Sequence, residues 1–349
     1  MLFDVLQRAG VRDTPMPQVH AAEPWGYRNR ARMRVESGSI GYSRRASNDF
    51  LPIQECPIVS PLVWRAAQTL QSTTAENKVP WPVGTRSFEL FANDDESGLQ
   101  LSLHLDATVA TVDRDAPRDL RLLCDALKQQ IPNLAGAGLL VGAIPDPKQP
   151  RRVQESGRVE IARWGETSLL YNVDGTAYRV TRNAFFQVNR FLTATMRQLV
   201  TAGRTGSLAY DLFAGAGLFS VALAGQFAKV VAIEIGEPAA TDLATHLRAC
   251  GEQHRAIRST VLDFLQRSTG NERPDLIVLD PPRAGLGPQT TRALARLNPR
   301  EIVYVSCDAG TFAADCRTLV DYGYKLETLH LLDLFPQTFH TETIAVLRR

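Results

Sequence analysis

The sequence lacks any long apolar run. Its 349 residues contain no stretch of roughly eighteen consecutive apolar residues, the length that a membrane-spanning helix requires, and no basic and then apolar leader follows Met1. Hydrophobic residues make up 44% and charged residues 22% of the chain, which is typical of a globular protein in water. We therefore expect neither membrane insertion nor secretion, and a cytoplasmic location.

Cysteines are few and scattered. There are five, an odd number, and neither a Cys-x-x-Cys pair nor a Cys/His spacing suited to a metal occurs. They are Cys56, Cys124, Cys250, Cys307 and Cys316. We expect reduced thiols and no bound metal.

Lysine is also scarce. It occurs only at Lys78, Lys128, Lys148, Lys229 and Lys325, so arginine supplies nearly all of the 39 basic residues. The guanidinium fork suits phosphate recognition, although a genome rich in G and C would produce the same bias. The net charge of +2 is too small to indicate a nucleic-acid binder, because such binding depends on clustering of charge.

One such cluster lies near the start of the chain. Arg28, Arg30, Arg32 and Arg34 recur at every second position, so in a β-strand their side chains leave from one face. A one-sided row of guanidinium groups is suited to a line of phosphates. The alternative is an outer strand face that is simply solvated.

The first 186 residues predict a mixed α+β domain. Alternating and helical hydrophobic patterns follow one another irregularly, with turn-forming segments between them. The expected strands are 27–35, 40–43, 87–92, 99–105, 137–144 and 168–172, and the expected helices are 62–71 and 117–131.

Residues 187–349 predict a second domain of the α/β class. Strands and helices alternate regularly, which indicates a doubly wound, Rossmann-like sheet with helices on both faces. The expected strands are 209–213, 230–234, 256–261, 276–280, 302–306, 325–333 and 342–347, and the expected helices are 190–202, 218–227, 237–250, 262–268, 289–297 and 311–322.

A glycine-rich turn follows the first strand of this second domain. Asp211-Leu212-Phe213-Ala214-Gly215-Ala216-Gly217 ends the strand and opens a helix, and its glycines let the backbone approach a ligand. Glu234 ends the next strand, where a carboxylate can accept both hydroxyls of an adenosine ribose. The third glycine of a dinucleotide fingerprint is replaced by Ser220. The pattern resembles the S-adenosylmethionine site of class I methyltransferases, with a nicotinamide-binding Rossmann domain as the alternative.

Two later strand ends carry reactive side chains. Asp280-Pro281-Pro282-Arg283 has an arginine where amino-group methyltransferases usually place an aromatic residue. Residues 302–306 form a buried strand pattern that delivers Cys307 to the carboxyl edge of the sheet, where open α/β sheets bind ligands. The alternative for Cys307 is a small residue of the core.

Five motifs follow one another in order: Phe185-Phe186-Gln187, Asp211 to Phe219, Asp280-Pro281-Pro282-Arg283, Ser306-Cys307-Asp308 and His340-Thr341-Glu342. With these spacings the chain resembles the RNA uracil-5-methyltransferase family, over residues 178–349 and more weakly over 27–61. The resemblance implies that S-adenosylmethionine contacts Gln187, Phe213, Glu234 and Asp280, with Gly215 in the turn that approaches it. It also implies that Cys307 is the nucleophile and Glu342 the base.

The chemistry of uracil independently calls for these two groups. Uracil C5 is too weak a nucleophile to accept a methyl group directly, so a thiolate such as that of Cys307 must first add at C6. The C5 proton must then be removed by a positioned base such as Glu342. We expect a parallel sheet to bring the two together, and a helix that begins near Thr311 to help lower the pKa of Cys307.

A uracil within a stack is out of reach of Cys307, so the target must lie in a loop or be flipped out of structured RNA. We expect the four arginines, with Arg151 and Arg152, to hold the backbone of this RNA, rRNA or tRNA, and the protein to act as a monomer. One alternative is a non-catalytic RNA-binding protein on the same fold. Another is an enzyme that methylates cytosine C5 or a small molecule, although the loop after Asp280 lacks the cysteine of the cytosine enzymes.

Many members of the family carry an amino-terminal oligonucleotide-binding barrel and an iron–sulfur cluster. We expect this chain to lack both. No cysteine precedes Cys56, so the four thiolates of such a cluster cannot be assembled in the same way. Cys56 is then a structural thiol, and no iron is expected. Leu218 stands where relatives often have asparagine, which removes one expected cofactor contact.

Overall fold

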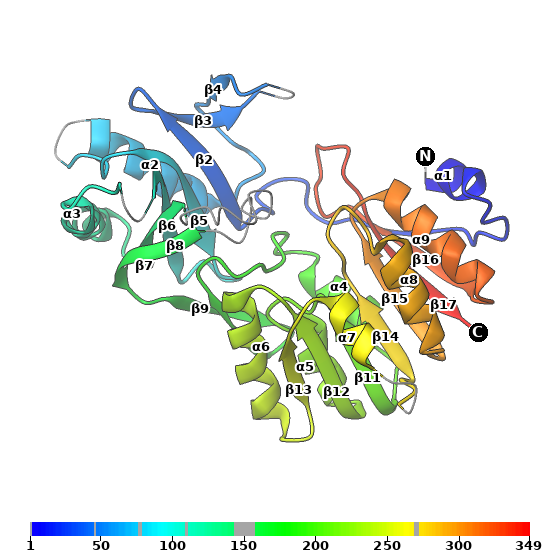
Figure 1. Cartoon of the computed structure of the whole chain (residues 1–349). Coiled ribbons are helices and arrows are strands. Elements are labelled where there is room, and N and C mark those ends of the chain that lie inside the picture. The colour runs from blue at the N-terminus through cyan, green and yellow to red at the C-terminus, as the bar shows by residue number, and fades with distance from the viewer. Residues whose placement is uncertain (1, 45–46, 76–78, 109–110, 143–157, 269–271) are drawn as a thin grey trace. The chain divides into compact units, whose positions relative to one another are not determined.

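The computed structural model describes residues 2–44, 47–75, 79–108, 111–142, 158–268 and 272–349. The chain divides into two compact units (Figure 1). Met1–Pro24 and Ala184–Arg349 form one, called here the doubly wound unit, and Trp25–Asn183 form the other, the seven-stranded unit. Each has a hydrophobic core of its own.

An eight-stranded sheet is the centre of the doubly wound unit, with the order β1-β16-β17-β15-β14-β11-β12-β13. Neighbouring strands are parallel, except that β17 is antiparallel to both β15 and β16. The predicted α/β fold is confirmed. The strands are β1 Gln18–His20, β11 Gly206–Leu212, β12 Phe227–Glu234, β13 Arg255–Arg258, β14 Leu276–Leu279, β15 Glu301–Ser306, β16 Lys325–Leu332 and β17 Glu342–Arg348.

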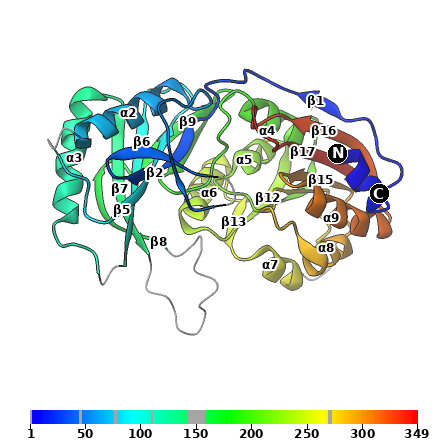
Figure 2. The same cartoon turned by 90° about the horizontal axis from the view of Figure 1, so that it is seen from above.

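Helices cover both faces of this sheet (Figure 2), which is why its strands are nearly continuous apolar runs. One face carries α4 Thr193–Thr201, α5 Leu218–Ala224 and α6 Glu237–Cys250. The other carries α1 Leu2–Arg8, α7 Val261–Arg267, α8 Gly287–Arg296 and α9 Ala309–Asp321. Among the helices of the described ranges, none has both the length and the apolar character needed to cross a membrane.

The first residues of the chain belong with the doubly wound unit, whereas the sequence predicts them in the first domain. Leu2 and Leu6 of α1 enter the core beside α9. Gly10 accepts a hydrogen bond from Arg317 Nη1 at 2.9 Å, and β1 adds a parallel strand to β16. These elements are short, so their hydrophobic pattern carries too few residues to reveal a distant partner.

The seven-stranded unit is a sheet in the order β4-β3-β2-β5-β6-β7-β8, with α2 and α3 packed on one face. A separate hairpin, β9 paired with β10, completes it. The elements are β2 Arg30–Glu36, β3 Ser39–Ser43, β4 Phe50–Pro52, α2 Pro61–Ala75, β5 Thr85–Ala92, β6 Leu99–Thr108, α3 Ala116–Gln130, β7 Leu134–Gly142, β8 Arg158–Gly165, β9 Ser168–Val173 and β10 Thr176–Thr181.

The two faces of this sheet differ in chemistry. On the central strands, every second residue is apolar and packs against α2 and α3, as Ala31 and Met33 do on β2. The residues between them lie on the opposite face, called here the polar face, which carries Arg32, Arg34, Ser87, Ser102 and His104.

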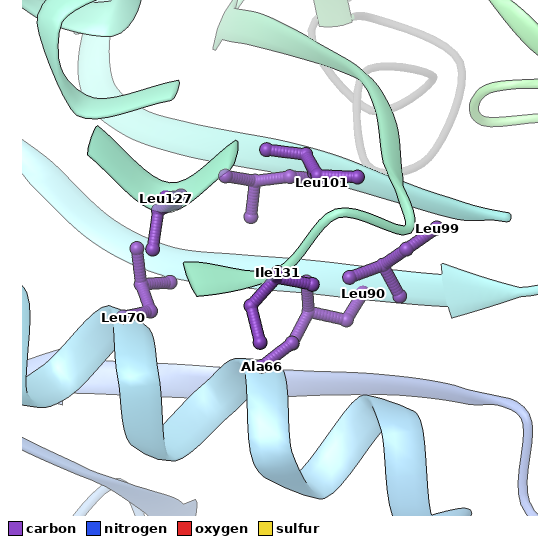
Figure 3. Close-up of a pocket in the computed structure, with 8 residues that line it drawn as sticks. Ala66, Leu70, Leu90, Leu99, Leu101, Leu127 and Ile131 are labelled. Carbon is purple, nitrogen blue, oxygen red and sulfur yellow. The ribbon is translucent and has the colours of Figure 1, made fainter. Parts of the chain in front are cut away.

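A small pocket lies inside the core of the seven-stranded unit, between α2, α3 and the sheet. Figure 3 shows that its lining side chains point toward one another, and all are aliphatic. It has no polar group that could bind or activate a substrate, so we regard it as a packing gap. The lining residues are Ala66, Leu70, Leu90, Leu99, Leu101, Leu127, Ile131 and Leu134.

Candidate active site

A pocket of about 320 Å³ lies at the carboxyl ends of β11 and β14 in the doubly wound unit. This is the edge at which open α/β sheets bind ligands. The pocket collects four of the five residues predicted to contact a cofactor: Gln187, Phe213, Gly215 and Asp280. Its full lining is Phe185, Phe186, Gln187, Phe213, Ala214, Gly215, Ala216, Leu218, Phe219 and Asp280.

The turn after β11 has an unusual backbone. Phe213, Gly215 and Gly217 have φ angles of +63°, +54° and +95°. Only glycine adopts such angles at little cost, so the strain at Phe213 points to a functional constraint. A side chain at position 217 would also meet Leu243 at 2.9 Å. The turn thus depends on its glycines, and its backbone forms part of the pocket wall.

Glu234, the fifth predicted residue, is fixed by three backbone amides. Its Oε2 accepts a hydrogen bond from the N–H of Gly215 at 2.9 Å. Its Oε1 accepts from the N–H groups of Ile235 at 2.9 Å and Gly236 at 2.6 Å. A carboxylate has about four acceptor positions, so one remains for a ligand hydroxyl. The bond to Gly215 attaches Glu234 to the pocket wall.

Two carboxylates lie near each other at the pocket, of which the half-buried Asp280 lines it and Asp211 is fully buried behind the lining. Asp280 follows β14, and Asp211 lies on the neighbouring strand β11. Ser220 donates its hydroxyl to Oδ2 of Asp211, while Oδ1 is buried without a partner among the described residues. Burial raises the pKa of Asp211 to about 7, and burial together with the charge of Asp211 raises the pKa of Asp280. This environment favours a cationic ligand, which would stabilise both charges.

Cys307 and Glu342 lie at the end of an antiparallel strand pair. The pairing of β15 with β17 ends at Ser306 and Thr343, and Cys307 directly follows Ser306 while Glu342 directly precedes Thr343. The charge of Glu342 acts on the Cys307 thiol, so the two side chains are near each other. The parallel arrangement predicted from the sequence is wrong, because β17 is the strand that reverses direction. The two predicted catalytic side chains are nevertheless adjacent.

The charges around Cys307 oppose its ionisation in the cofactor-free protein. Burial raises the pKa of the Cys307 thiol, and the charges of Glu342 and Asp280 raise it further. The lowered pKa expected from a helix near Thr311 is therefore not found. Helix α9 does begin nearby, but the carboxylate of Asp308 caps its first turn by accepting from the N–H of Thr311 at 2.9 Å, so a negative charge already lies at this helix end.

Glu342 is 5% exposed and similarly perturbed. Burial and the charge of Asp280 raise its pKa well above the usual value for a glutamate. Asp280 also lines the pocket and acts on Cys307, so the two sites form one electrostatic group.

Arg283 is a member of this group that the sequence did not assign. Its charge lowers the pKa of both Cys307 and Glu342. Its Nη2 lies 3.4 Å from Nε2 of His340, in the turn before β17. The sequence does contain a signal for this residue, since Arg283 follows directly on the end of a predicted strand. In the sequence analysis, however, Arg283 serves only to argue against methylation of an amino group.

Comparison with known proteins identifies the family. An RNA methyltransferase of Streptomyces avermitilis, itself described as uncharacterized, is 33% identical over an alignment of 352 positions, which covers 98% of this chain and 72% of that protein. The 23S rRNA (uracil(1939)-C(5))-methyltransferase RlmD of Edwardsiella ictaluri is 31% identical, over 98% of this chain and 74% of the other. This chain belongs to the RNA uracil-5-methyltransferase family.

Two further likenesses agree with membership in this family. The profile of the tRNA (Uracil-5-)-methyltransferase family matches residues 270–349, which contain Cys307 and Glu342. The crystal structure of the Pyrococcus abyssi tRNA (uracil-54, C5)-methyltransferase in complex with S-adenosyl-L-homocysteine has the same fold. Its TM-score is 0.76 at 21% identity, covering 99% of this chain and 81% of that one.

S-adenosylmethionine is the cofactor of the RNA uracil-5-methyltransferases, and the pocket fits it. The molecule has a sulfonium and an ammonium group, which suit the carboxylates of Asp211 and Asp280. One of its ribose hydroxyls can donate to the acceptor position that remains on the fixed carboxylate of Glu234. Within the described ranges, no three His, Cys, Asp or Glu side chains are grouped so that they could hold a metal ion.

The four arginines predicted to contact RNA lie in the seven-stranded unit and differ in exposure and in hydrogen-bond partners. Arg30 is turned inward, with its side chain 12% exposed beside Glu89 and its guanidinium 4.1 Å from the ring of Phe91. Arg28 donates to the carbonyl of residue 30, and Arg34 pairs with Glu36. Only Arg32 of the four is fully exposed. Arg151 and Arg152, also predicted to contact RNA, lie outside the described residues.

Proposed function

We propose that this protein is an S-adenosylmethionine-dependent methyltransferase that forms 5-methyluridine in structured RNA by covalent catalysis. The observation that carries the proposal is the closeness of Cys307 to Glu342 and Asp280 at the end of the β15–β17 pairing. This supports a nucleophile and a base held near each other, at the edge of the sheet where the cofactor fits. We propose that the doubly wound unit holds the cofactor and that the seven-stranded unit binds the RNA.

In the proposed reaction, Sγ of Cys307 forms a bond to C6 of the uracil. The electron pair of the C5–C6 double bond moves toward C5, which becomes nucleophilic. When bound, S-adenosylmethionine would supply an electrophilic methyl group to C5, and cleavage of its sulfur–methyl bond would leave S-adenosylhomocysteine. Glu342 then removes the proton on C5, the double bond re-forms, and Cys307 leaves as a thiolate. The proton on Glu342 finally passes to solvent, which restores both side chains.

We assign Arg283 a supporting role in the first step. Because its charge lowers the pKa of both neighbours, Arg283 favours the thiolate of Cys307 and the carboxylate of Glu342. Asp280 has the opposite effect on both, and a cationic cofactor next to Asp280 would weaken that effect. Thiol activation is therefore expected to improve once the cofactor is bound.

The test is to incubate the protein with S-adenosylmethionine and unmodified tRNA or 23S rRNA, and to analyse the nucleosides by mass spectrometry. We expect 5-methyluridine in one of the two RNAs, and its identity would decide between a tRNA and an rRNA substrate. Formation of 5-methylcytidine instead, or of no methylated nucleoside in either RNA, would contradict the proposal.

A further inference from the structure

His104 on the polar face of the seven-stranded unit is an unusual buried histidine. It lies on β6 opposite Ser87 of β5 and is 6% exposed. Neither ring nitrogen has a hydrogen-bond partner among the described residues. Buried polar groups nearly always have one, and a neutral imidazole offers both a donor and an acceptor. The two ring nitrogens are therefore suited to binding a ligand.

Two cations lie near this ring. The pKa of His104 is lowered to about 3 by burial and by the charges of Arg32 on β2 and Arg158 on β8. Burial and the charge of Arg32 also lower the pKa of Arg158. At neutral pH the imidazole is therefore uncharged, while the two guanidinium groups are close enough to repel each other. Two such cations beside a neutral N–H donor favour the binding of an anion.

The two arginines lack a compensating carboxylate in the part of the chain that the structure describes. Arg32 donates from Nε and Nη2 to the hydroxyl of Ser87, at 3.1 and 3.0 Å. Neither Arg32 nor Arg158 forms an ion pair with any residue in the described ranges. Nearby carboxylates pair with other arginines: Glu89 with Arg30 at 3.8 Å, Glu160 with Arg182 at 2.9 Å and Asp106 with Arg86 at 3.1 Å.

We propose that His104, Arg32 and Arg158 form a binding site for a phosphodiester group of the RNA substrate. Guanidinium groups donate to phosphate oxygens in a forked geometry, and the imidazole supplies a further N–H from the floor of the site. The bound phosphate would accept a hydrogen bond from His104. The inference rests on the proposed function, because RNA is the source of the phosphate. Of the four arginines predicted to contact RNA, it assigns a phosphate contact to Arg32 alone.

Four substitutions in the full-length protein test the site. Arg32→Gln and Arg158→Gln each remove one cation, and His104→Phe removes the ring nitrogens but keeps a planar ring. Arg121→Gln is the matched control, because it removes an exposed arginine from α3 on the opposite face of the sheet. Binding of a fluorescein-labelled RNA hairpin with a uridine-containing loop is measured by anisotropy over a range of salt concentrations.

We expect each of the three site variants to weaken hairpin binding about tenfold, the usual effect of losing one charged hydrogen bond. The two arginine variants should also reduce the slope of log affinity against log salt by about 0.7–0.9, because one fewer counterion is released. Arg121→Gln should change affinity less than about twofold. Wild-type affinity in all three site variants would overturn the proposal.

Two further measurements distinguish an RNA site from a structural histidine and from a site for a free anion. His104→Phe should unfold at the same temperature as the wild type or higher, since it removes an unsatisfied buried group; a lower midpoint would mean that His104 is structural and would count against the site. Inorganic phosphate at millimolar concentration should compete weakly with the hairpin. Full displacement of the RNA by phosphate would show a site for a free anion and overturn the assignment to RNA.

Steady-state kinetics separate a failure of the phosphate site from a failure of the proposed function. The site variants should methylate RNA with a raised KM and an unchanged kcat, because they are remote in sequence from Cys307 and Glu342. If all variants show wild-type KM, the phosphate site is wrong and the methyltransferase stands. If the wild-type protein methylates no RNA, the proposed function fails, and the binding data alone decide whether the site exists.

Discussion

Glu342 directly precedes Thr343, the residue of β17 that pairs with Ser306 of β15, and Cys307 directly follows Ser306. The two strands are hydrogen-bonded to each other up to this point, so the rigid sheet holds the two side chains near each other. Such rigidity is what a nucleophile and a base need in order to act on neighbouring atoms of one ring.

Replacing Glu342 with glutamine should separate the two halves of the reaction. The thiol can still add, and more readily, because the charge of Glu342 raises the pKa of Cys307. Without a base the C5 proton remains, and turnover should fall by about 10²–10⁴. Methylated RNA attached to the protein should therefore accumulate on a denaturing gel. Normal turnover in Glu342→Gln would remove this residue from its assigned role.

The rate of adduct formation should rise with pH. The pKa of Cys307 is raised above its ordinary value, so the thiolate is scarce at neutral pH and increases about tenfold for each pH unit below that pKa. Glu342, whose pKa is also raised, acts only in the later removal of the C5 proton, so it does not set the rate of adduct formation. The rate of single-turnover adduct formation, measured between about pH 6 and pH 9.5, would show this rise; a plateau that begins below about pH 7 would contradict it.

Arg283→Gln should shift that same profile toward higher pH. In the wild-type protein the charge of Arg283 lowers the pKa of both Cys307 and Glu342, so loss of the guanidinium should raise both pKa values. Arg283→Lys is the control, because it keeps the positive charge. An identical profile in the glutamine variant would mean that Arg283 has no electrostatic effect on the reaction.

Glu234→Ala should weaken binding of S-adenosylmethionine by about 10- to 100-fold. The substitution removes a charged acceptor and leaves the N–H groups of Gly215, Ile235 and Gly236 without their partner. Titration calorimetry in the absence of RNA isolates this effect from catalysis. Glu237→Gln is a suitable control, since that side chain is exposed at the start of α6. Equal affinity in the alanine variant and the wild type would place the ribose elsewhere.

The cofactor-free protein should become less stable as the pH rises from about 4 to 7. The folded-state pKa of Asp211 is about 7, above the value of about 3.9 in an unfolded chain, so the folded state binds more protons in that interval. Asp211→Asn should weaken this dependence, to which Asp280 and Glu342 with their raised pKa values also contribute, and should raise the melting temperature at about pH 8, by roughly 2–4 °C per kcal/mol. A lower melting temperature at that pH, or an unchanged pH dependence, would show that Asp211 does not carry the buried charge.

Much of the doubly wound unit is predictable because its signals are local. Strand β15 and helix α6 follow from continuous apolar and helical patterns, and the structure has α6 at Glu237–Cys250, the range expected. The strand expected over 256–261 ends earlier, at Arg258. Thr260 caps α7 there by accepting from the N–H of Asp263 at 3.1 Å, and that cap overrides the β-propensity of Val261.

The features that the sequence does not reveal depend on contacts between distant segments. The direction of β17 is set by its pairing with β15 and β16, which no local pattern encodes. Strand β8, also missed, lies on the edge of its sheet and has only a partly buried face. The sequence also does not predict that the ring nitrogens of His104 lack a hydrogen-bond partner among the described residues. In the sequence, His104 is only one polar position within a strand.

Bonding of Cys307 to the target uridine can be observed by trapping the adduct. Substrate RNA in which 5-fluorouridine replaces uridine cannot lose a C5 proton, so the adduct should persist in the presence of S-adenosylmethionine. Mass spectrometry of the digested complex should find the methylated nucleotide on the peptide that contains Cys307, and Cys307→Ala should give no complex. A stable complex in Cys307→Ala, or none in a wild-type protein that methylates normal RNA, would contradict covalent catalysis by this thiol.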